Sequence, residues 1–267
     1  LQQFSSSGDE ATQNLLSGFL AQLPAELADF ALRCSLIDAL HPKLCEAITG
    51  KPDAIKSLEL LRSETPMLTS VENSDWLRLH PLIREYLRSK ASYSLSAIEQ
   101  QEIHQRAWHW LAEQGDAEQA ARHALAAGYA QDAFALIADS LYDSCMKAGH
   151  YGTVAEWLAR MPETEIFLNT PLRLTAGWQA ALNGDWQRAE HFVGSLVEPP
   201  DSDAGLYGEA LAILAVANSR AERLDVAERY SSAYPKNAAD SLASRGITHI
   251  RAFSALCSGA SEEARRL

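Results

Sequence analysis

Six polar or aromatic side chains interrupt the apolar stripes of three helices expected at about 170–183, 206–220 and 240–257. They are Arg173, Trp178, Asn218, Arg245, His249 and Arg251. An indole can stack on a ring, and guanidinium groups can pair with an anionic group. The set is therefore a candidate effector-binding site. The alternative interpretation is that the arginines are solvated and that Trp178 belongs to the core.

Three histidines, His104, His109 and His123, are close enough in sequence to suggest metal ligands. His104 and His109 are five residues apart, so on a helix they point to different faces. No cysteine accompanies them, although structural zinc sites usually contain one. The sequence therefore predicts no metal site.

Motifs of catalysis and nucleotide binding are missing from the sequence. It contains no G-x-x-x-x-G-K-[ST] phosphate loop, no G-x-S-x-G elbow, no H-E-x-x-H and no acidic calcium loop. No cluster of acid, base and nucleophile stands out either. We therefore expect no catalytic residues and no cofactor in this chain, which is not expected to be an enzyme.

Charge and composition limit the classes of partner. The formal charge is −12, and neither the first 94 residues nor the remainder has an excess of Lys and Arg. Binding to a polyanion needs clustered cations, so a broad nucleic-acid surface is not expected. No apolar run reaches the ~18 residues of a membrane span, and no signal peptide is recognisable. Four scattered cysteines without a C-x-x-C pair are typical of a reduced, cytoplasmic protein.

The first ninety residues predict helices followed by a hairpin. Apolar spacing indicates a helix from Thr12, a second after Pro24, a third at 42–49 ending at Gly50, and a fourth near 52–63 with Ile55, Leu58 and Leu61 buried. Two β-prone runs, 67–71 and 76–79, are separated by the turn-forming residues ENSD. Pro81 then starts another helix. This order of elements predicts a winged-helix domain over residues 1–92, with Trp76, Leu79, Leu82, Ile83, Tyr86 and Leu87 in one core.

The fourth helix occupies the position of a DNA-recognition helix. Its exposed positions are Asp53, Lys56, Glu59, Arg62 and Glu64. Because these charges are mixed and the helix offers no Asn or Gln, base readout is not expected. The domain is predicted to be a packing module.

A helical repeat follows over residues 93–267. Copies of one phrase, of which GDWQRAEHF is the clearest, begin at 115, 149, 184, 222 and 259, with a further copy at 128. The main copies are 34 to 38 residues apart, a period typical of helix-turn-helix repeats. Gly184 is expected to end one helix, Asp185 to cap the next, and small Ala189 to allow close helix packing. The fold class is therefore mainly α, a winged helix followed by a TPR-like superhelical array whose first helices line a concave binding face.

Several motifs in order resemble a known family. They are L-P at 23–24, C-S-L-I-D at 34–38, L-C-x-A-I-T-G at 44–50, W-x-R-x-H-P-L at 76–82 and H-A-L-A-A-G at 123–128. Over about residues 1–200 the chain resembles the middle of the large ATP-dependent LuxR-type transcriptional regulators, signal-transduction ATPases typified by the maltose-regulon activator of enteric bacteria.

This resemblance implies a protein of four parts: a nucleotide-binding domain, a winged-helix arm, a helical-repeat sensor and a DNA-binding helix-turn-helix. The first and last are not found in this sequence, so ATP and promoter DNA would be bound by domains outside it. The sensor is expected to be cut within a repeat at Leu267. His80, at the exit of the wing, is a candidate contact to the nucleotide-binding domain, with a simple helix-entry role as the alternative.

The predicted function is effector sensing that shifts the regulator toward a state that oligomerises on DNA. Partners would be the other domains of the same protein and a small-molecule or protein effector, whose identity the sequence leaves open. The alternative is a free-standing TPR-like scaffold for protein–protein interaction.

Overall fold

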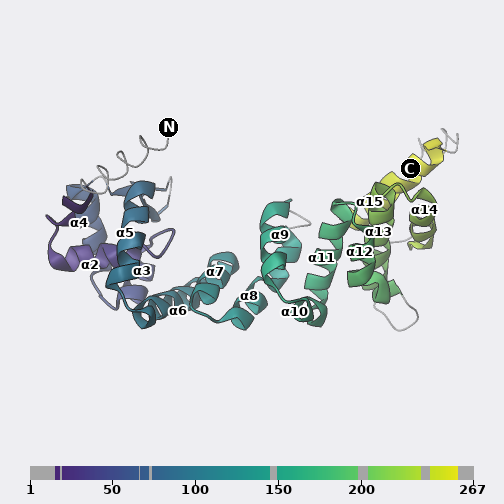
Figure 1. Cartoon of the computed structure of the whole chain (residues 1–267). Coiled ribbons are helices and arrows are strands. Elements are labelled where there is room, and N and C mark those ends of the chain that lie inside the picture. Colours follow the sequence, from purple (N-terminus) through teal and green to yellow (C-terminus); the bar gives the residue numbers. More distant parts are fainter. Residues whose placement is uncertain are drawn as a thin grey trace, which may run out of the picture. The chain divides into compact units, whose positions relative to one another are not determined.

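The computed structural model describes residues 16–18, 20–65, 67–71, 74–144, 149–197, 204–235 and 241–257. The chain divides into two compact units, Leu1–Leu136 and Ile137–Leu267. The expected fold class is confirmed: the elements are helices apart from one small antiparallel sheet (Figure 1). The predicted start at Thr12 and the repeat copy at Gly259 lie outside the described residues.

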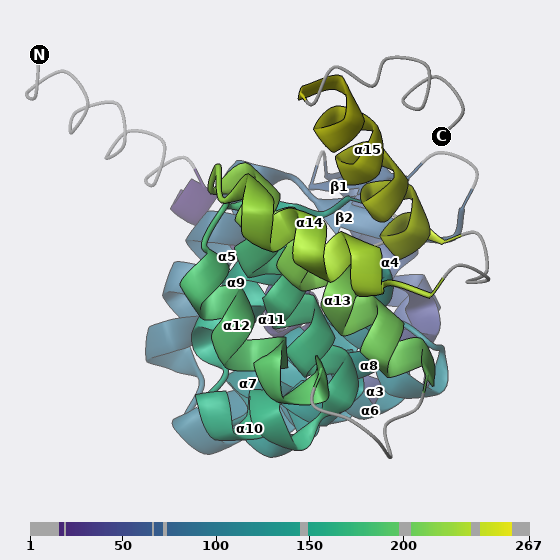
Figure 2. The ribbon, with the colours of Figure 1, turned by 90° about the vertical axis from the view of Figure 1, so that its right-hand side faces the viewer.

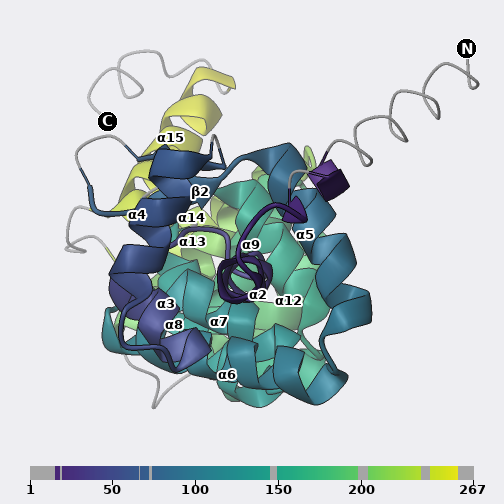
Figure 3. The same cartoon turned by 90° about the vertical axis from the view of Figure 1, so that its left-hand side faces the viewer.

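The first unit opens with the winged helix. Its helices are α2 (Ala25–Cys34), α3 (Pro42–Thr49), α4 (Ala54–Glu64) and α5 (Pro81–Ser94), and its strands are β1 (Leu68–Ser70) and β2 (Leu77–Leu79). The strands form the predicted hairpin, with Leu68 opposite Leu79. A further bridge joins Leu40 to Leu77 on the other side of β2. α2 lies between α5 on one side and α3 and α4 on the other (Figure 3).

Local signals define the ends of these helices. Pro42 begins α3, and Gly50 ends it at a φ of 69°, in the left-handed region that glycine adopts without a steric cost. Pro81 begins α5, where a missing N–H costs nothing. Both helices therefore begin at the predicted residues.

Two residues assigned to the winged-helix core are exposed, so those predictions were wrong. Ile55 is 49% exposed because the buried stripe of α4 runs through Ala54, Leu58 and Leu61, about 100° away around the helix. Leu82 is 55% exposed for the same reason, because it precedes Ile83 in the buried stripe of α5.

The core of the winged helix continues into the first helical pair, α6 (Ala97–Glu113) and α7 (Ala117–Ala126). One cluster of buried apolar side chains extends from Leu20 to Ala120 in α7 and includes Ile103 and Leu111 of α6. α3 contacts α6 directly. The winged helix and the α6–α7 pair therefore share one hydrophobic core, and the division between the compact units falls inside α8 (Ala130–Asp143). The domain boundary after residue 92 stays a prediction.

The second unit contains the remaining helices. They are α9 (Tyr151–Arg160), α10 (Glu163–Leu168), α11 (Thr170–Leu182), α12 (Trp186–Val193) with the short 3-10 turn η2 (Gly194–Val197), α13 (Ala204–Arg220), α14 (Leu224–Ala233) and α15 (Leu242–Cys257). α11 packs on α12 and α13, and α14 and α15 both pack on α13 (Figure 2).

The repeat signals act as predicted. Gly115, Gly128, Gly149 and Gly184 all have positive φ, and Glu222 takes the same left-handed conformation at the equivalent place in the next repeat. Asp185 accepts a hydrogen bond from the N–H of Arg188 and so caps α12, and Ala189 is fully buried.

Candidate functional site

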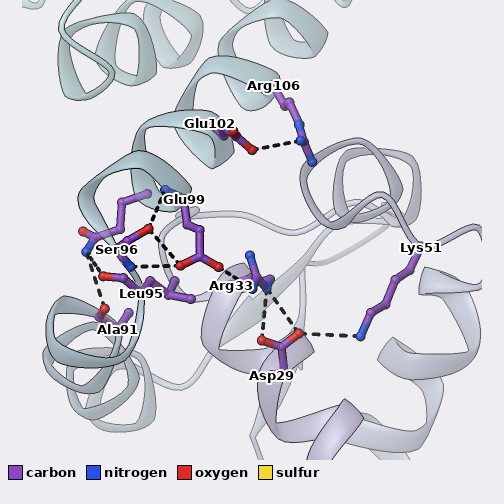
Figure 4. Close-up of polar contacts among 10 residues, drawn as sticks. Asp29, Arg33, Lys51, Ala91, Leu95, Ser96, Glu99, Glu102 and Arg106 are labelled. Carbon is purple, nitrogen blue, oxygen red and sulfur yellow. Dashed lines mark hydrogen bonds and ion pairs between the residues drawn. The ribbon is translucent and has the colours of Figure 1, made fainter.

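An ion-pair network joins the winged helix to α6 within the first unit (Figure 4). Arg33 of α2 lies at its centre. The guanidinium donates through Nε to Asp29 Oδ1 at 3.0 Å and through Nη2 to Glu99 Oε1 at 3.0 Å. Lys51 adds a second cation, with Nζ 3.6 Å from Asp29 Oδ2. The side chain of Arg33 thus links α2 to α6, although Arg33 and Glu99 are 66 residues apart in the sequence.

Glu99 also stabilises the start of α6. Its Oε2 accepts from the N–H of Ser96 at 2.9 Å, while Ser96 Oγ accepts from the N–H of Glu99 at 3.2 Å. This reciprocal capping box satisfies two donors that the first turn leaves without partners. The hydrogen bonds from Ser96 and the adjacent Arg33 lower the pKa of Glu99. Sequence reasoning missed this contact, although S-x-x-E at 96–99 is the pattern that predicts it.

A second cluster of charge lies around Asp38, in the loop after α2. Asp38 Oδ1 is 2.6 Å from Arg84 Nη2 and 2.9 Å from Arg88 Nη2. Arg88 Nε also donates to the carbonyl of Ser35 at 2.9 Å. Burial and the neighbouring Arg84 lower the pKa of Arg88. One carboxylate is therefore shared by two guanidinium groups of α5.

Two of the three conspicuous histidines face each other. His104 of α6 and His123 of α7 have their Nδ1 atoms 2.9 Å apart and their rings stacked. His123 is only 6% exposed, and its burial, with the nearby His104, lowers its pKa to about 4. His109 is exposed and stacks on Trp108. Among the described residues, no group of three or more His, Cys, Asp and Glu is arranged to hold a metal ion.

Aromatic rings of the wing and of α6 pack against each other. The ring centroid of Trp76, just before β2, lies 5.3 Å from that of His41 and 6.1 Å from that of Trp110 on α6. His41 and Trp110 are stacked at 5.5 Å. These contacts, with the bond from Arg33 to Glu99, also link the winged helix to the first helical pair.

The predicted effector residues on α11 and α13 make internal contacts. Arg173 donates to the carbonyl of Phe192, at 3.1 Å through Nε and 2.9 Å through Nη2, and so binds the C-terminal end of α12. Trp178 is 3% exposed, and its Nε1 donates to Glu209 Oε1 at 2.9 Å. Asn218 is 1% exposed and donates to the carbonyl of Leu214 at 2.8 Å.

The predicted effector residues on α15 differ from one another. Arg251 is half-buried, and its Nη2 donates to the carbonyls of Ser231 and Tyr234 at the end of α14. Arg245 and His249 are exposed and lie four residues apart, on one face of α15. The contacts of Arg173, Trp178, Asn218 and Arg251 are with other residues and do not join the set together. The effector-binding set stays a prediction.

A known protein family matches the part of the chain that forms the winged helix. The family model of the MalT winged helix domain matches residues 16–99. The domain covers α2 to α5, both strands and the capping box that starts α6.

Longer relatives are HTH-type transcriptional regulators. MalT of Klebsiella pneumoniae subsp. pneumoniae is 30% identical over 169 residues, which is 61% of this chain and 18% of that protein. AlkS of Pseudomonas putida is 25% identical over 182 residues, 67% of this chain and 20% of that protein. MalT of Yersinia pestis is 28% identical over 171 residues, 62% of this chain and 18% of that protein. The chain spans about a fifth of the length of these curated relatives.

A solved structure from Pyrococcus horikoshii, a Signal Transduction ATPase with Numerous Domains protein with a tetratricopeptide repeat sensor, aligns with this chain. The TM-score is 0.48 at 17% identity, over 90% of this chain and 36% of that one. Within the part of this chain that the structure describes, no helix is long and apolar enough to cross a membrane.

His80 precedes the first residue of α5 in the winged helix. It is exposed, its N–H donates to the carbonyl of Met67 at 2.8 Å, and its carbonyl accepts from the N–H of Arg84 at 2.9 Å. Its imidazole makes no capping hydrogen bond to α5. The backbone of His80 therefore serves helix entry, and its proposed contact to a nucleotide-binding domain remains a prediction.

Proposed function

We propose that this chain is the regulatory middle segment of a bacterial, cytoplasmic, ATP-dependent LuxR-type transcription activator. Effector binding to the helical pairs shifts the protein toward a state that oligomerises on promoter DNA. ATP and DNA are bound by domains outside this chain. The relatives named as HTH-type transcriptional regulators support the class of protein.

The observation that carries the coupling role is the shared core of the MalT winged helix and the α6–α7 pair. A close-packed core moves as a body, because small displacements cannot be absorbed by voids. The bond from Arg33 to Glu99 fixes α2 to the first turn of α6. A displacement of the first helical pair would therefore be passed directly to the winged helix.

The DNA contacts of the activator are assigned to another domain. Lys56 of α4 pairs at 3.1 Å with Asp53, the residue before this helix, so the charge of one α4 cation is already compensated. Phosphate contacts normally position a recognition helix before bases are read. The isolated winged helix should therefore show no sequence-selective retention in a gel shift at low salt.

Sequencing the gene on both sides of this segment is the first test of the proposal. A phosphate loop encoded upstream and a helix-turn-helix encoded downstream are expected. If neither is found, the chain is a free-standing scaffold, and the regulatory proposal fails.

Arg33→Gln in the complete regulator tests the coupling itself. A reporter fused to a neighbouring promoter should lose its response across a panel of carbon sources, while the abundance of the regulator is unchanged. Arg106→Gln is the matched control, because the ion pair of Arg106, at 3.1 Å, is with Glu102 of its own helix (Figure 4). An unchanged response in the Arg33 variant would contradict the relay through α6.

A further inference from the structure

A cavity of about 630 Å³ lies in the first unit between the hairpin, the start of α5 and α7. Its volume falls within the roughly 300–1,000 Å³ that is usual for small-molecule sites. Its walls include both polar and apolar side chains. Those that bear on ligand chemistry are Trp76, Arg78, Arg84, Leu111, Gln119 and His123.

Two arginines line the cavity, and they differ in how their charges are compensated. Arg84 and Arg88 share the single carboxylate of Asp38, which also lines the cavity. Arg78 of β2 is exposed, and no described residue pairs with its guanidinium. Asp116 also lines the cavity and contributes a second carboxylate. Two guanidiniums and two carboxylates thus form the charged part of the lining, and Arg78 is the lining cation without a partner among the described residues.

The wall formed by α7 offers directional hydrogen bonds. Asp116, Gln119 and His123 follow one another at helical spacing and line the cavity from one face of α7. Asp116 Oδ1 is already used, because it accepts from the N–H of Gln119 at 3.1 Å as the cap of α7. The amide of Gln119 has no partner among the described residues. In His123, Nδ1 is bonded to His104 and Nε2 is the remaining polar atom.

The rest of the lining is apolar. Trp76 presents an indole, and Leu111 and Leu79 present aliphatic side chains. Trp76 is held by the rings of His41 and Trp110, so its orientation is fixed before a ligand arrives. A preorganised apolar wall favours a ligand with an apolar body, because less conformational freedom is lost on binding.

We propose that this cavity binds a small organic monocarboxylate. The carboxylate pairs with Arg78 and Arg84, and the apolar body packs on Trp76 and Leu111. Guanidinium groups recognise carboxylates by parallel N–H···O bonds. A dianion such as a phosphate monoester is disfavoured, since Arg78 is the one lining cation without a partner among the described residues and Asp38 and Asp116 would repel the second negative charge.

Calorimetric titration of the chain with phenylacetate and hexanoate tests the proposal, with phenylacetamide as the matched uncharged probe. At least one carboxylate should bind saturably below about 10 mM, the range expected for a small ligand with one charge pair. The amide should bind at least about tenfold more weakly, because it lacks the charge-assisted hydrogen bonds. Phenyl phosphate should bind no more tightly than phenylacetate.

Two variants locate the binding. Arg78→Gln should weaken the carboxylate by about ten- to a hundredfold, the value of a hydrogen bond to a charged group. Arg62→Gln is the control, because Arg62 is exposed on α4 and does not line this cavity. The proposal is overturned if no carboxylate binds in this range, if acid and amide bind equally, or if Arg78→Gln binds as well as Arg62→Gln. Direct binding does not depend on the proposed regulatory function, so the two can fail separately.

Discussion

Acidification should weaken the first unit through the His104–His123 pair. One Nδ1 must donate and the other accept across 2.9 Å, so protonation of both rings sets two N–H groups against each other. The pair also faces Arg88, which disfavours a further positive charge on both rings, and Asp38, which favours one on His123. Burial is the largest cause and lowers the pKa of both histidines.

The magnitude follows from the two pKa values of His123. An unfolded histidine titrates near 6.5, and the folded side chain has a pKa of about 4. Between these values the unfolded chain holds a proton that the folded chain lacks, so stability falls as pH falls through this window. The loss is about 2 kcal/mol from about pH 7 to pH 5 and about 3 kcal/mol across the whole window.

Chemical denaturation at a series of pH values, followed by hydrogen exchange in α6 and α7, measures this loss. His123→Asn retains an amide near the former Nδ1 and removes the titration, so most of the pH dependence between about pH 7 and pH 5 should disappear. His109→Asn is the matched control, because His109 is exposed and does not contact the pair. A wild-type stability that is flat over this range would refute the reasoning, as would an unchanged slope in His123→Asn.

Three substitutions test the packing and capping through the melting temperature. Gly177→Ala should destabilise the second unit by about 1 kcal/mol or more, because a Cβ there would lie 2.7 Å from Val193 Cγ1. An increase in melting temperature would contradict this, because it would show that the Val193 side chain moves away without cost. Ala189→Leu should overpack α12 at a cost of about 1–3 kcal/mol, and no change would contradict its buried placement. Ser96→Ala should cost about 1 kcal/mol by removing the cap of α6. An unchanged melting temperature would show that α6 is stabilised by packing and not by this cap.

Helix ends were predictable because their signals are local. His41, Pro42 and Gly50 define α3 by themselves, since each acts on its own backbone within one turn. The repeat glycines were predictable for the same reason. Glu222 shows that the repeat imposes the left-handed conformation even where glycine is replaced.

Contacts between helices could not be predicted from spacing alone. His104 and His123 meet because α6 and α7 pack at a particular rotation, which no local signal encodes. The exposure of Ile55 has the same origin: an error of about 100° in the buried direction moves a residue from core to surface. Glu209 illustrates the point in the second unit, because Trp178 and Tyr142 donate to it from two different helices.

The arginines that interrupt apolar stripes explain how the effector-binding prediction should now be tested. Arg173 and Arg251 each bind carbonyls at the C-terminal end of a neighbouring helix, where the last turn leaves acceptors without intrahelical partners. Arg173→Ala should therefore lower the melting temperature, and a lost effector response in that variant would not locate a binding site. His249→Ala is a cleaner test, because the side chain is exposed on α15. If this variant keeps both its stability and its response to the effector, the face of α15 that carries His249 is not the binding surface.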